Sequence, residues 1–229
     1  MKDHPILFSG AMVRALLDGS KTQTRRVVKM PPSWDCFLCA DWGDGWWPYR
    51  SDDGESPNYD NNEIPMRCPY GQPGDRLWVR ETFLDTQGTG VEHRDEQGNR
   101  QRFAYAAETA PGSYGDAARK DYGLKWKPSI HMPRAASRIL LEVVSVRAER
   151  LRDCSKKDAI AEGIHCYEHS WRDAEYPLDD VAYEPVKGWP LRYSCPVQAY
   201  QALWESINGA GSWDSNPWVW VVEFKRVAP

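Results

Sequence analysis

Residues 9–28 read SGAMVRALLDGSKTQTRRVV, a stretch that joins a helical pattern directly to an extended one. Ser9 is a favoured N-cap residue, apolar side chains then recur at helical spacing, and Gly19 supplies the glycine that ends many helices. The residues from Thr22 to Val28 follow at once with an extended pattern. We therefore predict a short helix that delivers the chain into a strand.

Outward from this segment, regular structure is predicted from period-2 and period-3.6 spacing of apolar side chains. The Pro73-Gly74 turn leads into the alternating run 76–82, and the polar segment 86–102 indicates a hairpin or loop. Further strands are predicted at 103–107, 137–151 (one long strand or a bent pair) and 218–227, and helices at 155–163 and 197–207.

Two segments lack a sustained period and are rich in turn residues and aromatic side chains, at about 31–74 and 165–194. We interpret them as long insertions into a single domain that spans residues 1–229. The element order contains no βαβ unit and no GxGxxG. The expected fold class is therefore α+β, with a small mixed sheet or barrel and helices at its rim.

Composition limits the partners and the compartment. The formal net charge of −4 favours a small ligand over broad polynucleotide binding, which needs clustered Lys and Arg. The sequence contains no apolar run of membrane-spanning length and no signal-peptide pattern at its start, so we expect a cytoplasmic protein without a membrane partner. The six cysteines are spread along the chain and are expected to be reduced.

The segment Gly19 to Arg26 carries the most chemical information. In an extended chain Thr22, Thr24 and Arg26 point to one face, and Gln23 and Arg25 to the other. A lysine that leads into a strand presenting a hydroxyl and a guanidinium is typical of a small catalytic or anion-binding cluster. The alternative from these residues alone is a solvated basic edge strand.

Four features together resemble the ASCH domain family, whose fold is a PUA-like mixed β-barrel. They are Gly-x-Lys-Thr-x-Thr-x-Arg at 19–26, Pro-Gly-Asp-Arg-Leu-Trp-Val-Arg-Glu at 73–81, Asp-Ala-Ile-Ala-Glu-Gly at 158–163, and the closing aromatic strand. The resemblance runs in order from about Pro5 to Val227, interrupted by the two insertions. From Trp126 onward the chain is also similar to uncharacterised prophage-encoded members.

The resemblance implies an amidohydrolase that removes the acyl group from N4-acylated cytidine or a related nucleoside or base. It implies Lys21, Thr24 and Glu162 as the catalytic set, with no cofactor required for catalysis. In one scheme Lys21, with its pKa lowered, is the base and Thr24 the nucleophile. In the other, Lys21 or Glu162 activates a water. Arg26 is expected to stabilise an oxyanion or to hold a phosphate.

Three residues of the 76–82 strand are further substrate-binding candidates. Trp78 offers an aromatic face on which a base could stack, and core packing is its alternative role. Arg80 and Glu81 are neighbours in an alternating strand, so one of them is expected to face the pocket and the other solvent.

A structural zinc site is a further hypothesis. Cys36 and Cys39, with Cys68 downstream, have the spacing of three thiolate ligands, and His93 or another cysteine is the candidate fourth ligand. Such a site would tie the first insertion to the domain without taking part in catalysis.

Two other functions stay open on the sequence alone. One is a non-catalytic module that reads a modified base in RNA or DNA with the same pocket, for which the aromatic-rich insertions argue. The other is a ribonuclease, an activity of the wider family that is compatible with lysine and arginine around a phosphate.

Overall fold

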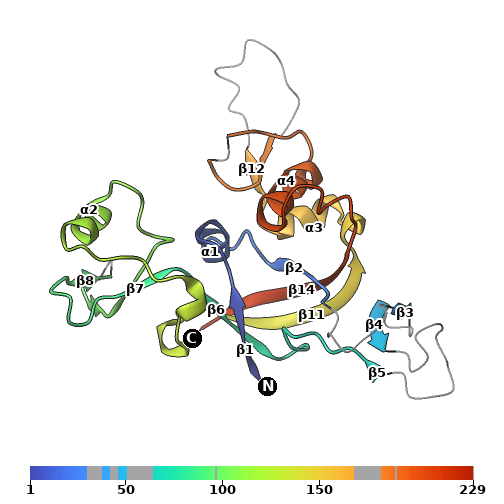
Figure 1. Ribbon diagram of the computed structural model, residues 1–229, viewed down its shortest axis with the longest axis horizontal. Coiled ribbons are helices and arrows are strands. Elements are labelled where there is room, and N and C mark those ends of the chain that lie inside the picture. Colours follow the sequence, from blue (N-terminus) through green and yellow to red (C-terminus); the bar gives the residue numbers. More distant parts are fainter. Residues whose placement is uncertain are drawn as a thin grey trace, which may run out of the picture.

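The computed structural model describes residues 1–29, 38–41, 46–50, 64–95, 97–167, 182–188 and 190–228. In these ranges the protein is an α+β structure built on one mixed sheet (Figure 1). Its main path runs through five strands in the order β1 (Asp3–Leu7), β6 (Arg76–Arg80), β11 (Leu140–Arg150), β14 (Trp218–Val227) and β2 (Gln23–Val27).

The sheet is antiparallel except at one edge, where β1 pairs with β6 in parallel. The long strand β11 bends at a register shift between Val143 and Ser145. A single pair, Ala148 with Trp46, attaches the small strands of the first insertion to β11. These are β3 (Leu38–Asp41), β4 (Trp46–Arg50) and β5 (Ile64–Pro65).

The described strands do not close into the expected barrel, because β1 and β2 are the two free ends of the main path. The connection between these edge strands runs through α1 (Gly10–Leu17). Met12, Val13 and Leu16 of this helix are buried in the core. The chain therefore passes from β1 to β2 through a packed helix, and these two edge strands do not pair with each other.

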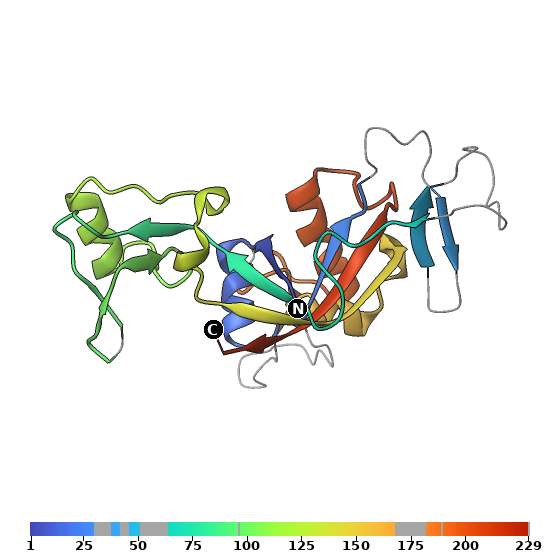
Figure 2. The ribbon, with the colours of Figure 1, turned by 90° about the horizontal axis from the view of Figure 1, so that it is seen from below.

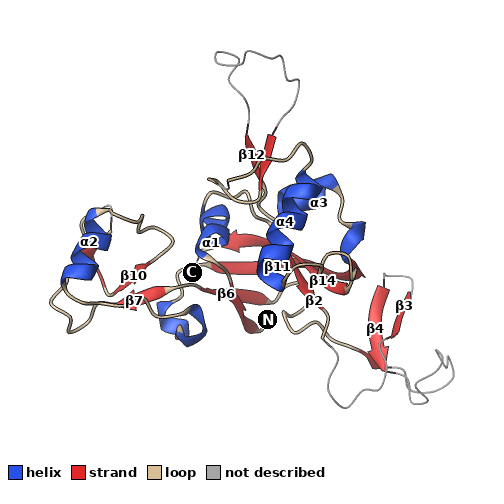
Figure 3. Cartoon of the chain, turned by 45° about the horizontal axis from the view of Figure 1, so that its top comes forward, coloured by secondary structure: helices blue, strands red, loops and turns tan. Residues whose placement is uncertain are grey.

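Three helices lie together beside the sheet, as Figure 3 shows: α1, α3 (Lys156–Ala161) and α4 (Pro196–Asn208). The starts of α1 and α3 confirm the predicted capping signals. The Ser9 side chain accepts the hydrogen bond of the Met12 amide. Ser155 and Asp158 form a reciprocal capping box at the start of α3.

The main core lies between these helices and the sheet. It contains Ile6 and Leu77 from one edge, Trp220 from the centre of the sheet, and Leu203 and Trp204 from α4. Residue Trp220 is 1% exposed, so at least this part of the aromatic content serves packing.

A separate α2 lobe, residues 83–136, projects from the end of β6, opposite the β3–β4 hairpin (Figure 2). Its core contains Phe83, Met132 and Ala136. Its elements are β7 (Phe83–Asp85), β8 (His93–Arg94), β9 (Arg100–Gln101), β10 (Phe103–Tyr105), α2 (Tyr114–Asp121), and 3₁₀ turns at Ser129–His131 and Arg134–Ala136.

The second insertion contains more regular structure than expected. Its strands β12 (His165–Tyr167) and β13 (Ala182–Glu184) pair with each other in antiparallel orientation. Before this insertion, a 3₁₀ turn at Leu151–Asp153 precedes α3. No helix in the described ranges combines the length and the apolar character that a membrane crossing requires.

Candidate functional site

Lys21 and Glu162 meet although 141 positions separate them in the chain. They form an isolated antiparallel bridge between the start of β2 and the end of α3. The Lys21 ammonium donates to the Glu162 carbonyl oxygen at 2.7 Å and to its Oε2 at 2.9 Å. One side chain therefore ties both the backbone and the carboxylate of Glu162 to the strand.

Gly163 makes this close approach possible. Its φ is +92°, and a Cβ at this position would lie 3.1 Å from the Cβ atoms of both Ala15 and Lys21. Any other residue would strain the backbone and crowd the lysine. The close packing against Lys21 therefore explains why a glycine follows Glu162 at the end of the 158–163 motif.

The lysine side chain is fully buried, and the Glu162 side chain is 3% exposed. Desolvation lowers the pKa of Lys21 below its ordinary value of 10.5, and the Glu162 carboxylate opposes that shift. The nearby positive charges of Arg26 and Arg25 add to the lowering. The surroundings of Lys21 therefore lower its pKa, as expected from the sequence.

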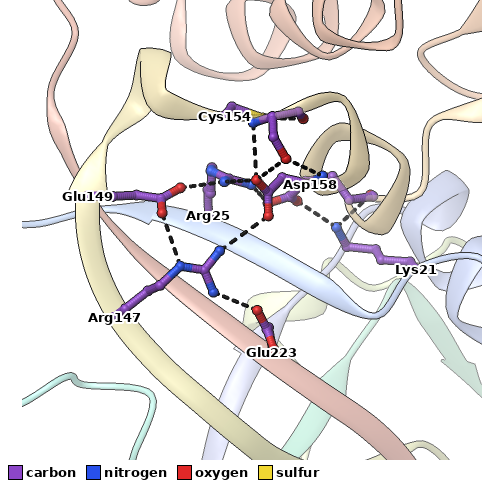
Figure 4. A network of polar contacts seen from close by, with 9 residues as sticks. Lys21, Arg25, Arg147, Glu149, Cys154, Asp158 and Glu223 are labelled. Atoms are coloured by element: carbon purple, nitrogen blue, oxygen red, sulfur yellow. Dashed lines mark hydrogen bonds and ion pairs between the residues drawn. The ribbon is translucent and has the colours of Figure 1, made fainter. Parts of the chain in front are cut away.

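Arg25 holds Glu162 from its other side. Its side chain is also fully buried, and its Nη1 lies 3.4 Å from Glu162 Oε1. Its Nη2 pairs with Glu149, and lies 3.6 Å from Asp158 (Figure 4). The Glu162 carboxylate is thus fixed between two cations, each of which bonds a different oxygen.

The same network continues onto the surface of the sheet through Arg147 (Figure 4). Its guanidinium contacts Glu149 at 3.0 Å, Asp158 at 3.2 Å and Glu223 at 2.5 Å. Arg25 and Arg147 therefore share two carboxylates, and this sharing orients Arg25 before any ligand binds.

A cavity of about 220 Å³ opens beside this cluster. Thr24 and Glu162 line it together with the α4 residues Tyr200 and Trp204. Lys21 is not among its lining residues, and no hydrogen bond joins Lys21 to Thr24 within the described part of the chain. The carboxylate, and not the amine, is the charged catalytic candidate that reaches this space.

Tyr200 is a cavity residue that the sequence pattern indicates only as part of an apolar helical face. The Arg25 guanidinium carbon lies 6.0 Å from the centre of its ring. Burial raises the pKa of Tyr200 well above its ordinary value, so the phenol stays protonated. It supplies a neutral aromatic wall with a hydroxyl.

Arg26 diverges from Arg25, as alternation along a strand requires. It donates to the Leu7 carbonyl oxygen at 2.8 Å and stacks over the Phe8 ring at 5.3 Å. Thr22 and Thr24, predicted to share the face of Arg26, differ in environment, since Thr22 is exposed and Thr24 is 1% exposed.

Trp78, Arg80 and Glu81 do not line the small cavity. Trp78 has the guanidinium carbons of Arg80 and Arg134 at 5.4 and 5.9 Å from its ring centre. Arg80 donates to the Ile130 carbonyl oxygen. These two residues contact the 129–136 segment and lie apart from the Lys21 cluster.

Glu81 is 1% exposed and pairs with Arg138 through two hydrogen bonds of 2.9 and 3.1 Å. Burial raises its pKa above the ordinary 4.5, and the arginine opposes the shift. Its position joins the main sheet to the α2 lobe. Strand alternation predicts that one of Arg80 and Glu81 faces the pocket. In the structure Arg80 contacts Ile130 and Glu81 pairs with Arg138.

The proposed zinc ligands are only partly described. Cys36 lies outside the described residues, Cys68 is a buried free thiol, and burial raises its pKa to about 12. Its core position also differs from that of His93, which lines cavities of the α2 lobe. Within the described ranges, no three His, Cys, Asp or Glu side chains form a metal-binding group. Cys39 lies in β3, and the zinc site as a whole stays a prediction.

Comparison with known proteins gives no further assignment: no protein-family model, curated protein or solved structure matches this chain. The residues of the cavity and the motifs to which they belong are therefore the basis for a functional proposal.

Proposed function

We propose that this protein is an amidohydrolase that removes the acyl group from N4-acylated cytidine or a related modified nucleoside, on an ASCH-like, PUA-related domain. The observation that carries the proposal is the buried Lys21–Glu162 pair, with Glu162 and Thr24 lining one small cavity. The cavity is smaller than the roughly 300–1,000 Å³ typical of drug-sized ligands, and its size favours a single base.

Between the two schemes that the sequence allows, the contacts support activation of a water by Glu162. A base must lie within hydrogen-bond reach of the proton that it abstracts. Glu162 reaches the cavity, whereas both polar contacts of the Lys21 ammonium go to Glu162 itself. Lys21 is then a positioning residue, which fixes the direction of the carboxylate.

In this scheme Glu162 accepts a proton from a water as the water oxygen bonds to the acyl carbon. The tetrahedral intermediate collapses with cleavage of the bond between the acyl carbon and N4. The proton on Glu162 passes to N4, and the products are cytidine and a carboxylic acid. Thr24 donates its hydroxyl hydrogen to the developing oxyanion.

The direct test is conversion of N4-acetylcytidine to cytidine by the purified protein, followed by chromatography. Thr24→Val keeps the shape of the side chain and removes the hydroxyl, and we expect kcat/KM to fall by about 10²–10³-fold. Thr22→Val is the matched control, because Thr22 is exposed and outside the cavity wall.

Absence of cytidine with the folded wild-type protein would reject the enzymatic proposal. Equal rates for the two threonine variants would reject the role of Thr24 and leave the water-activation step standing. Thermal unfolding of each variant separates a lost hydroxyl from a lost fold.

A second candidate is a non-catalytic module that binds a modified base in the same cavity. The complete burial of Lys21 favours it, since an ion pair with this geometry also serves to fasten α3 to β2. This alternative predicts that N4-acetylcytidine binds, as measured by calorimetry, and is recovered unchanged.

A further inference from the structure

The cations around the small cavity fall into two groups. One group is matched by carboxylates: Lys21, behind the cavity wall, pairs with Glu162, and Arg25, which lines the cavity, pairs with Glu149, Asp158 and Glu162. In contrast, the other two cations on the cavity wall, Arg26 and Lys29, have no carboxylate partner in the described part of the chain. The cavity wall therefore carries uncompensated positive charge.

These two cations are also the more accessible ones. Thr24 is 1% exposed, Arg26 is half-buried and Lys29 is exposed. All three residues line the cavity. The hydroxyl and the Glu162 carboxylate thus lie at the buried end, and the unmatched charges lie toward solvent.

We propose that Arg26 and Lys29 form an anion subsite that binds the 5′-phosphate of a pyrimidine nucleotide. The inference rests on the proposed function and deepens it, since it names a nucleoside monophosphate as the preferred ligand. The base enters toward Glu162, which leaves the phosphate at the exposed end. A guanidinium offers paired donors that suit phosphate oxygens, and an ammonium supplies a mobile point charge.

A mononucleotide fits the observations better than a nucleic-acid strand. The cavity of about 220 Å³ has room for little more than one base. The net charge of −4 also opposes a long polyanion, whose affinity grows with the number of phosphate contacts.

The test is calorimetric binding of cytidine and of cytidine 5′-monophosphate to the wild-type protein and to Lys29→Gln and Lys29→Glu. For the wild type we expect the monophosphate to bind about 10-fold more tightly than cytidine, which corresponds to about 1.4 kcal/mol. Lys29→Gln reduces this ratio, and Lys29→Glu brings it to one or below. Raising the salt from about 0.05 to 0.5 M reduces the wild-type ratio, because exposed charges are screened.

Lys157→Gln is the control, because this lysine is also exposed but lies on α3 outside the cavity wall. Its ratio is expected to equal that of the wild type. Equal binding of the two ligands, or a phosphate preference that survives Lys29→Glu, would overturn the subsite. A 5′-phosphorylated trinucleotide that binds more tightly than the monophosphate would assign the phosphate to a strand and overturn the mononucleotide preference.

These outcomes separate the two proposals. Phosphate-dependent binding without release of acetate from N4-acetylcytidine leaves the subsite standing and rejects the hydrolase. Turnover of the nucleoside without any phosphate preference does the reverse.

Discussion

Glu162 and Glu81 are both almost fully buried carboxylates held by basic side chains, yet they lie in different surroundings. Glu162, at the end of α3, is bonded on one oxygen by Lys21 and on the other by Arg25, and it lines a cavity. Glu81, at the base of the α2 lobe, has Arg138 on both oxygens and does not line that cavity. Burial and an ion pair are common to both carboxylates, and contact with the small cavity is what separates them.

The largest expected difference between the two carboxylates is in activity. Glu162→Gln removes the proposed base and should lower kcat/KM for N4-acetylcytidine by about 10²–10⁴-fold. Glu81→Gln should leave it within about threefold. Steady-state assays with both variants check this, and circular dichroism shows whether each is folded. Comparable losses in both would mean that activity merely follows stability.

The two ion pairs should also differ in what their disruption costs. Arg138→Met leaves the buried Glu81 carboxylate without a described cation, so we expect a loss of about 3–5 kcal/mol in unfolding free energy. Lys21→Met leaves Glu162 with Arg25 at 3.4 Å, and we expect a smaller loss of about 1–3 kcal/mol. Urea unfolding gives both values, and the reverse order would contradict the compensation by Arg25.

Stability should depend on pH with opposite signs in the two regions. The folded-state pKa of Glu81 is raised above 4.5, so the folded protein binds more protons, and this contribution is lost as pH rises through the folded pKa. The pKa of Lys21 is lowered below 10.5, so the folded protein binds fewer protons there, and stability rises with pH up to 10.5.

Urea midpoints across both pH windows measure these slopes. Glu81→Gln should flatten the acidic slope, and Lys21→Met the alkaline one. An alkaline slope that is unchanged in Lys21→Met would mean that another group titrates there.

The smallest expected effect concerns the helix that carries Glu162. Ser155→Ala removes the side-chain half of the capping box and should cost about 1 kcal/mol. Ser113→Ala is the matching change in the α2 lobe, where Ser113 caps α2. Only the Ser155 change should also weaken binding of cytidine, as calorimetry would show. Equal effects on binding would remove the link between the cap and the site.

The sequence predicts those parts of the fold that have local signals. The caps at Ser9 and Ser155 and the alternation at 76–80 are confirmed, as are the long strands at 140–150 and 218–227. The helix α2 was missed because its only buried residue is Asp116, so it presents no apolar stripe.

The parallel pairing of β1 with β6 joins residues about 70 positions apart, for which no local pattern exists. The element order predicts a small mixed sheet or a barrel, and the mixed sheet is what the described residues form, whereas the family resemblance favoured the closed barrel.

The candidate site was predictable only in part. The meeting of Lys21 with Glu162 was implied by the motifs of the resemblance, since a separation of 141 positions cannot be read from spacing. The sequence indicates Arg25 only as a positive charge near Lys21. Strand alternation gives its face but cannot say that three carboxylates from β11 and α3 lie opposite. Tyr200 belongs to an apolar helical pattern that ordinary core residues share, so the sequence does not indicate that it lines a cavity.

The pairing of β2 has a consequence for how the protein is made. In the described sheet its only strand neighbour is β14, whose residues 218–227 are synthesised long after Thr24 has left the ribosome. Until then the basic strand has no ladder to join, and contacts this distant in sequence form slowly. The nascent chain therefore carries an unfinished pocket until residues 218–227 have been made, and a ligand of that pocket can bind only after β14 has paired with β2.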